Sequence, residues 1–338
     1  MTKTLIIEGV TIEAGQRRHV GIEIARLFDH TEMTIPVEVI RGKEDGPTIF
    51  ISAAIHGDEI NGIEIIRRLL THKKLLSQIK GTLIIVPIVN VFGFNRNVRY
   101  LPDRRDLNRV FPGSKQGSLA SQLAYKFMNE VVMKCDYGID LHTGSAHRYN
   151  LPHIRAALDN PEINALAKSF GVPVILNSNA RDGSLRQAAA DKNIKILLFE
   201  GGEALRYDEK VIRSAENGII TTLCSIGMLD KSLVKNKLSK EREVFRANSS
   251  HWIRAPYSGS MQVRKKIGNT VKEGEIIAII YGPFGLKKHS VLANHTGIII
   301  GMTMIPLVNN GDALFHIATF DDIWAVAEEI AEYDENLE

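Results

Sequence analysis

Cysteine is scarce in this sequence, because its 338 residues include only Cys135 and Cys224. The two lie far apart and lack the short spacing of metal-binding pairs, which excludes a disulfide scaffold and fits a reducing compartment such as the cytoplasm. No run approaches the roughly 18 apolar residues of a membrane span. The N-terminal stretch MTKTLIIEGVTIEAG carries Glu8 within its short apolar run, unlike a signal peptide. We therefore expect a cytoplasmic protein with no membrane partner.

A dominant charge of either sign is also absent. The sequence has 42 lysines and arginines against 39 acidic residues, a net charge of +3, and no basic run. A nucleic-acid-binding protein would concentrate basic charge on one face, so we expect no nucleic-acid partner. With 44% hydrophobic and 24% charged residues, the chain is neither disordered nor a coiled coil.

Apolar strand patterns alternate with amphipathic helical patterns through the first two thirds of the chain. Short strand-like runs occupy residues 1–45. The strands predicted after them cover 47–57, 81–90, 137–144, 173–177 and 194–202, and the helices cover 61–76 and 118–135. This alternation predicts an α/β domain whose sheet is covered by helices on both faces.

The pattern changes after a polar, charge-rich connector over residues 230–250. Beyond it, short strands with glycine turns indicate an all-β module, and similar half-motifs beginning at Ser258 and Thr296 suggest a small sandwich with pseudo-two-fold symmetry. We expect a first domain over 1–245, a β-module over 246–322 and an acidic tail over 323–338, either a surface helix or a frayed end. An exposed edge of the module could pair with a second copy, so a homo-oligomer is possible.

Three residues could form a catalytic metal site. His56 and Glu59 follow an apolar strand in AAIHGDEINGIE, and His142 ends a second strand in GIDLHTG. Ligand sites in α/β sheets gather at the carboxyl ends of strands. Two histidines and one glutamate form a familiar catalytic zinc set, with an open position for water. The alternative is an exposed turn whose acidic residues favour the start of the next helix, with His142 purely structural.

A general base would then be needed to take a proton from water. Glu200 follows five apolar residues in six in IKILLFEGGE, so it is either a desolvated base or a strand-end residue turned to solvent. Glu203 is the local competitor and has a more exposed setting.

An arginine-rich stretch separates these motifs. Arginine forks suit a substrate carboxylate or a developing oxyanion. The stretch NRNVRYLPDRRDLNRVFPG contains Arg96, Arg99, Arg104, Arg105 and Arg109. We interpret Arg104 and Arg105 as solvated loop residues, whereas Asn108 and Arg109, between two apolar residues, are candidates for the site.

Taken together, HGDE, RDLNRVFPG, DLHTG and FEGGE, in this order, resemble the succinylglutamate desuccinylase/aspartoacylase family, which is related to the zinc carboxypeptidases. The resemblance covers most of residues 35–320. It implies a zinc-carboxypeptidase-like mixed-sheet domain with helices on both faces, plus a small C-terminal domain similar to the barrel-sandwich hybrids of biotinyl and lipoyl domains. Lys287 and Lys288 lack the flanking residues of a modified lysine, so we expect the module to narrow the mouth of the site, and Tyr257 or Tyr281 could reach the substrate.

The resemblance also implies a role for each motif residue. It implies that one Zn²⁺ per chain is bound by His56, Glu59 and His142, and that Glu200 is the general base. Asn108 and Arg109 would bind the substrate carboxylate, Asp106 would orient His56, and Arg99 would polarise the scissile carbonyl, with Arg96 left open by the loop length.

The function that follows is a zinc-dependent amidohydrolase that deacylates a small N-acyl amino acid or a related carboxylate-bearing amide. Two alternatives remain: a zinc carboxypeptidase acting on peptides, and a non-catalytic scaffold on a hydrolase fold.

Overall fold

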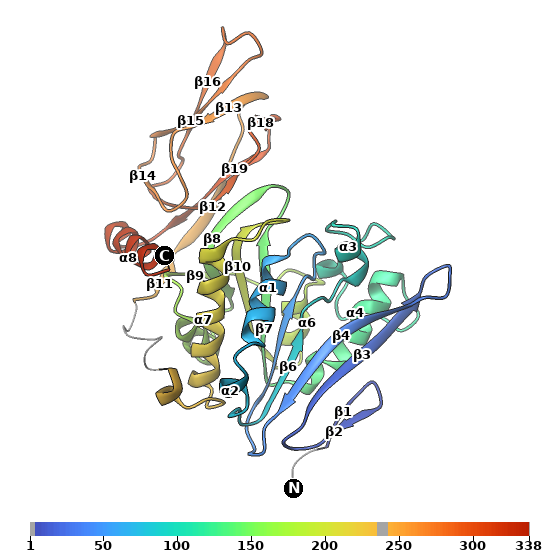
Figure 1. Ribbon diagram of the computed structural model, residues 1–338. Coiled ribbons are helices and arrows are strands. Elements are labelled where there is room, and N and C mark those ends of the chain that lie inside the picture. The colour runs from blue at the N-terminus through green and yellow to red at the C-terminus, as the bar shows by residue number, and fades with distance from the viewer. Residues whose placement is uncertain (1–3, 235–242, 338) are drawn as a thin grey trace.

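The computed structural model describes residues 4–234 and 243–337, and its main feature is one large mixed sheet (Figure 1). The thirteen strands of this sheet are β3 (Arg17–Arg26), β4 (Glu32–Arg41), β5 (Thr48–Ala53), β6 (Thr82–Val86), β7 (Tyr137–Gly144), β8 (Arg148–Ala156), β9 (Val174–Asn177), β10 (Lys195–Glu203), β11 (Phe245–Ala247), β12 (Ser249–Arg254), β14 (Thr270–Val271), β17 (Gly297–Thr303) and β19 (Ala313–Thr319). The longest path runs β12-β19-β17-β8-β10-β7-β5-β6-β4-β3. Strands β10, β7, β5 and β6 are parallel to one another, which brings their carboxyl ends to one edge.

Helices cover both faces of this sheet, as the sequence predicted. The described helices are α1 (Asn61–Leu69), α2 (Lys73–Leu76), α3 (Val91–Asn95), α4 (Leu119–Glu130), α5 (Pro161–Phe170), α6 (Leu185–Ala190), α7 (Glu209–Ser225) and α8 (Ile323–Glu335), with short 3-10 turns at Leu107–Arg109, Val132–Lys134 and Lys231–Val234. One core lies beneath α1, α5 and α7 and contains Phe170 and Ile219. The core of the opposite face lies beneath α4 and α6 and contains Phe127 and Ala188. The mixed α/β fold class is confirmed.

Two predicted helices are shorter in the structure. The helix predicted over 61–76 is interrupted at His72, whose backbone has a non-helical ψ of 54° and whose ring bonds to Glu216 of α7. The helix predicted over 118–135 ends at Glu130 and is followed by a 3-10 turn. At His72 the contact with Glu216 accompanies the break in the helix, although the helical spacing of apolar residues in the sequence continues beyond it.

Strand periodicity explains why polar side chains reach one face of the sheet centre. In β7, Ile139 and Leu141 point into the core beneath α1 and α7, so the alternating residues Asp140 and His142 point to the other face. The same alternation in β10 buries Phe199 beneath the helices and leaves the next residue, Glu200, on the polar face. The functional site lies on this face.

The C-terminal strands are continuous with the large sheet. Strand β17 pairs with β8, where Gly301 is the partner of Asn150, and β19 and β12 follow outward. A separate four-stranded sheet extends beyond them (Figure 1) and contains β13 (Gly259–Val263), β15 (Ile276–Tyr281), β16 (Lys288–Leu292) and β18 (Leu307–Val308). A two-stranded sheet near the N-terminus contains β1 (Leu5–Ile7) and β2 (Val10–Ile12).

The acidic tail contains a helix. Val326 and Ile330 of α8 are buried against Ile298 and Ala318 of β17 and β19. The division into domains at residues 245 and 322 stays a prediction. None of the helices among residues 4–234 and 243–337 combines the length and the apolar character that crossing a bilayer requires.

Candidate active site

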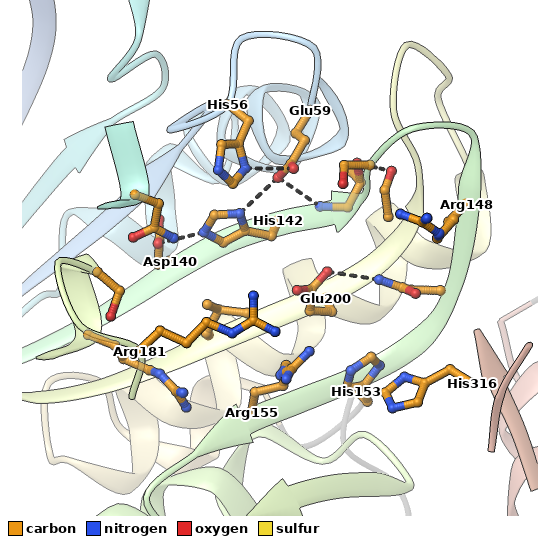
Figure 2. A pocket seen from close by; sticks show the side chains of 18 of the residues that line it. His56, Glu59, Asp140, His142, Arg148, His153, Arg155, Arg181, Glu200 and His316 are labelled. Atoms are coloured by element: carbon orange, nitrogen blue, oxygen red, sulfur yellow. Dashed lines mark hydrogen bonds and ion pairs between the residues drawn. The ribbon is translucent and has the colours of Figure 1, made fainter. Parts of the chain in front are cut away.

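His56, Glu59 and His142 converge at the carboxyl ends of β5 and β7 (Figure 2). All three side chains are buried, and one ligand atom from each lies within 4.8 Å of the others. Glu59 lies between the two rings: its Oε1 is 2.7 Å from His56 Nδ1, and its Oε2 is 2.8 Å from His142 Nδ1. Gly57 permits this turn, because a Cβ at that position would lie 2.0 Å from the backbone of Gly93.

A second carboxylate lies behind each histidine. His56 Nε2 is 3.2 Å from Asp106 Oδ1, and His142 Nε2 is 2.7 Å from Asp140 Oδ2. Ser52 in turn donates a hydrogen bond to the other oxygen of Asp140 over 2.7 Å. Carboxylates in these positions hold the proton on Nε2 and direct the Nδ1 lone pair toward Glu59, as in histidine–metal sites.

The electrostatics of this arrangement call for a cation. A neutral His142 that donates Nε2–H to Asp140 would point its Nδ1 lone pair at the Glu59 carboxylate. Burial by itself lowers the pKa of His142, but Asp140 and Glu59 together raise it well above its usual value. Burial likewise opposes ionisation of Glu59, yet His56 and His142 hold its pKa far below the usual range. A proton or a metal ion at the centre satisfies these groups, so the donor set fits a divalent metal.

Arg99 joins the cluster of His56, Glu59 and His142 to Asp106. Its guanidinium donates hydrogen bonds to Glu59 Oε1 over 3.2 Å and to Asp106 Oδ2 over 2.9 Å. Arg99 also lines the cavity next to this cluster, whereas Arg96 is not among the lining residues. Between the two arginines left open by the sequence, the structure places Arg99 at the site.

Glu200 lies on β10, between β7 and β8, and each of these two strands carries a histidine that lines the cavity. It is the sheet partner of His142 on β7 and of His153 on β8. Burial raises the pKa of its carboxyl group, while His142, Arg155 and a 2.9 Å hydrogen bond from Asn150 Nδ2 oppose that rise. Its competitor Glu203 does not line the cavity.

The cavity beside these residues has a volume of about 420 Å³, and Asn108 and Arg109 also line it. Asn108 Oδ1 accepts a hydrogen bond from the backbone amide of Leu185 over 2.9 Å, which joins the Asn-Arg turn to the start of α6. Arg109 donates to the backbone carbonyl of Asn108 over 2.6 Å.

Several lining residues were not identified from the sequence. The spacing of two between Asp140 and His142 is a usable signal, because alternate residues of a strand share a face. Further lining residues lie on β8, on the loop before α6, on α6 itself and on the C-terminal strands: Arg148, Asn150, His153, Arg155, Asn179, Arg181, Arg186, Trp252, Arg254 and His316. Trp252 and His316 show that the C-terminal strands supply part of the cavity wall. Tyr257 and Tyr281 are not among the lining residues, and Tyr257 instead stacks on His289.

Comparison with known proteins assigns the chain to a family. The model of the succinylglutamate desuccinylase/aspartoacylase catalytic domain matches residues 45–226. The chain belongs to this family. The matched segment contains His56, Glu59, His142 and Glu200, and the C-terminal strands that complete the cavity lie outside it.

Similar proteins extend the match beyond the family's catalytic domain. An N-alpha-acetyl-L-2,4-diaminobutyric acid deacetylase from Halomonas elongata is 27% identical over 297 residues, which cover 84% of this chain and 85% of that protein. A succinylglutamate desuccinylase from Silicibacter sp. TM1040 has a similar structure, with a TM-score of 0.79, 22% identity and coverage of 90% and 95% of the two chains. The product-bound ectoine utilization protein EutE of Ruegeria pomeroyi has a TM-score of 0.80, with the same identity and coverage. These structures share the family's fold, C-terminal strands included.

Proposed function

We propose that this protein is a zinc-dependent amidohydrolase that removes the acyl group from a small N-acyl amino acid or a related carboxylate-bearing amide. The observation that carries the proposal is the position of Glu200, a buried carboxylate on the strand next to His142 of a cluster that fits a metal. The Halomonas elongata relative, by its name a deacetylase of an N-acetylated amino acid, supports the same reaction class.

His56, Glu59 and His142 would hold the zinc ion. When bound, zinc supplies a Lewis acid that lowers the pKa of water and polarises the amide carbonyl. Asp106 and Asp140 would keep both histidines in the tautomer that binds metal.

Glu200 would act as the general base and then as the general acid. It takes a proton from the attacking water as that water adds to the amide carbon, and it returns a proton to the leaving nitrogen when the C–N bond breaks. Burial suits Glu200 for this role, because a carboxyl group with a raised pKa is a stronger base. Arg99 would help to stabilise the negative charge that develops on the carbonyl oxygen.

The charge of the cavity favours an anionic substrate. Seven arginines line it, against the three carboxylates of Glu59, Asp140 and Glu200. Asn108 and Arg109 would bind the substrate carboxylate, for which the planar arginine fork is well shaped.

The size of the cavity favours a small substrate over a peptide. A volume of about 420 Å³ lies within the range of small-ligand sites. Trp252, Arg254 and His316 of the C-terminal strands form one wall of the cavity, which leaves less room for a long peptide. The complete set of ligands and base counts against a non-catalytic scaffold.

The experiment that tests the proposal measures amine release from N-acetyl and N-succinyl amino acids and from short peptides, with and without a chelator. Hydrolysis of a small acyl amino acid that a chelator abolishes and zinc restores is the expected result. Cleavage of peptides alone would instead identify a carboxypeptidase. Absence of both turnover and bound zinc would favour the scaffold.

A further inference from the structure

His153 of β8 lines the cavity and carries a buried hydrogen-bond acceptor that has no partner among the described residues. Its side chain is only 1% exposed, and its Nδ1 lies 2.7 Å from the backbone carbonyl of Leu151. A carbonyl oxygen can only accept, so Nδ1 carries the proton. Burial and the nearby Arg155 lower the pKa of His153 to about 3, so the ring is neutral and Nε2 is a bare lone pair. That Nε2 is buried and has no hydrogen-bond partner.

A buried acceptor without a partner is unfavourable, and a ligand that donates a hydrogen bond to it removes the penalty. His153 and His316 lie next to each other on the cavity wall in Figure 2. His316 is stacked on Trp252, with ring centroids 4.7 Å apart and planes 7° apart. The acceptor is therefore held in a rigid wall built from β8 and the C-terminal strands.

The place of His153 in the sheet indicates which part of the substrate it meets. His153 is the sheet partner of Glu200, on the side away from His142. In the proposed reaction Glu200 returns a proton to the leaving nitrogen, so the amine portion of the substrate lies next to Glu200. The strand beyond Glu200 on the side away from His142 is β8, so a substrate side chain that passes Glu200 on that side meets β8 first.

The two arginines near His153 disfavour a cationic donor at its ring, although the Glu200 carboxylate lies on the neighbouring strand. Arg155 is close enough to lower the pKa of both His153 and His316, and Arg148 lies over the Trp252 ring at 5.4 Å. An ammonium group bound to His153 would meet this positive charge, whereas a hydroxyl or carboxamide group would not.

We propose that His153 Nε2 determines substrate specificity by accepting a hydrogen bond from a neutral donor, a hydroxyl or carboxamide, on the side chain of the amino acid released. This inference rests on the deacylase function proposed above and narrows its substrate class.

Three nearly isosteric substrates test it: the N-acetyl derivatives of norvaline, homoserine and 2,4-diaminobutyrate, whose side chains end in methyl, hydroxyl and ammonium. For the zinc-loaded wild type we expect kcat/KM for the homoserine derivative to exceed that for the norvaline derivative by about tenfold or more. In His153→Phe the ratio should fall to within about threefold of one, and in His153→Gln, which keeps an acceptor oxygen, it should recover in part. For each variant, both kcat/KM values are measured on the same preparation, so their ratio does not depend on the fraction of the enzyme that is folded.

Two results would overturn the inference: a hydroxyl preference that is unchanged in His153→Phe, or a wild type that prefers the ammonium substrate. Calorimetry on the same variants measures the affinities of free homoserine and norvaline. The ratio of these affinities tests the same hydroxyl preference without a catalytic step. A wild type that hydrolyses none of the three substrates and no other acyl amino acid would contradict the proposed function, while the affinity ratio would still decide the role of His153.

Discussion

Asn150 donates a hydrogen bond from its side-chain amide to Glu200 Oε2 over 2.9 Å, and its sheet partner on the other side is Gly301 of β17. The orientation of the candidate base therefore depends on a strand more than a hundred residues away in the sequence. This relationship joins the C-terminal strands to the centre of the site.

Replacing Glu200 by Gln should leave the metal bound and lower kcat by about 10²–10⁴-fold or more, because glutamine cannot accept a proton from water. Turnover and zinc content are measured on the same sample. Glu203→Gln is the matched control and should stay within about twofold of the wild type, since Glu203 does not line the cavity. Near-wild-type turnover of Glu200→Gln would remove Glu200 from the mechanism.

Gly301→Ala tests the connection through β17. A Cβ at Gly301 would lie 3.0 Å from both Asn150 Oδ1 and His316 Cβ, so one of them must shift. Because small displacements of catalytic groups are costly, we expect kcat to fall about tenfold with a smaller effect on KM. The control is Gly21→Ala in β3, whose Cβ would meet only Thr34 at an ordinary 3.4 Å. Equal effects of the two substitutions on kcat would show that Gly301 has no special link to the site.

Asp140→Asn and Asp106→Asn should each weaken zinc binding about 10–100-fold, since each carboxylate orients one histidine. Competition with a chromogenic chelator measures the zinc affinity. Asp58→Asn is a suitable control, because Asp58 lies in the turn between His56 and Glu59, yet its buried Oδ1 has no hydrogen-bond partner. Unchanged zinc affinity in both orienting variants would be incompatible with a metal bound by His56 and His142.

Stability should depend on pH through His316. Burial, His153 and Arg155 lower its pKa from 6.5 to about 3 in the folded protein. The unfolded chain therefore takes up the proton first, and the stability contributed by the neutral ring is complete above about pH 6.5 and is lost as the pH falls toward about 3. As the pH falls through this window, His316→Phe should become more stable relative to the wild type, by up to about 1.4 kcal/mol per pH unit. Urea unfolding at several pH values, with both proteins in the same metal state, measures the difference; a difference that does not vary with pH would contradict it.

The residues of the candidate metal site and Glu200 could be singled out from the sequence because each follows an apolar strand within a short motif. Strand-end position made His56, His142 and Glu200 candidates, and the order of the four motifs gave each its expected role. Asp140 was within reach of the same argument, since a strand places residues two apart on one face.

The outer wall could not be identified in this way. Strand β8 contains Pro152 and several polar residues, which obscure its strand pattern, and it supplies Asn150 and His153. His316 reaches the cavity through the pairing of β17 with β8 and of β19 with β17, and Trp252 through the further pairing of β12 with β19. Such long-range pairing has no local signal in a single sequence.

The pairing of β8 with β17 has a consequence for biosynthesis. A nascent chain that has emerged as far as α7 already holds both histidines, Glu59 and Glu200, but the part of β8 that pairs with β17, Arg148 to Asn150, still lacks its partner and the cavity lacks a wall. The wall closes only when β19, near the end of the chain, has been translated and has joined β17. The C-terminal strands thus turn an open ledge into a chamber, so the proposed metal ligands are complete on the growing polypeptide before the chamber that would select a substrate.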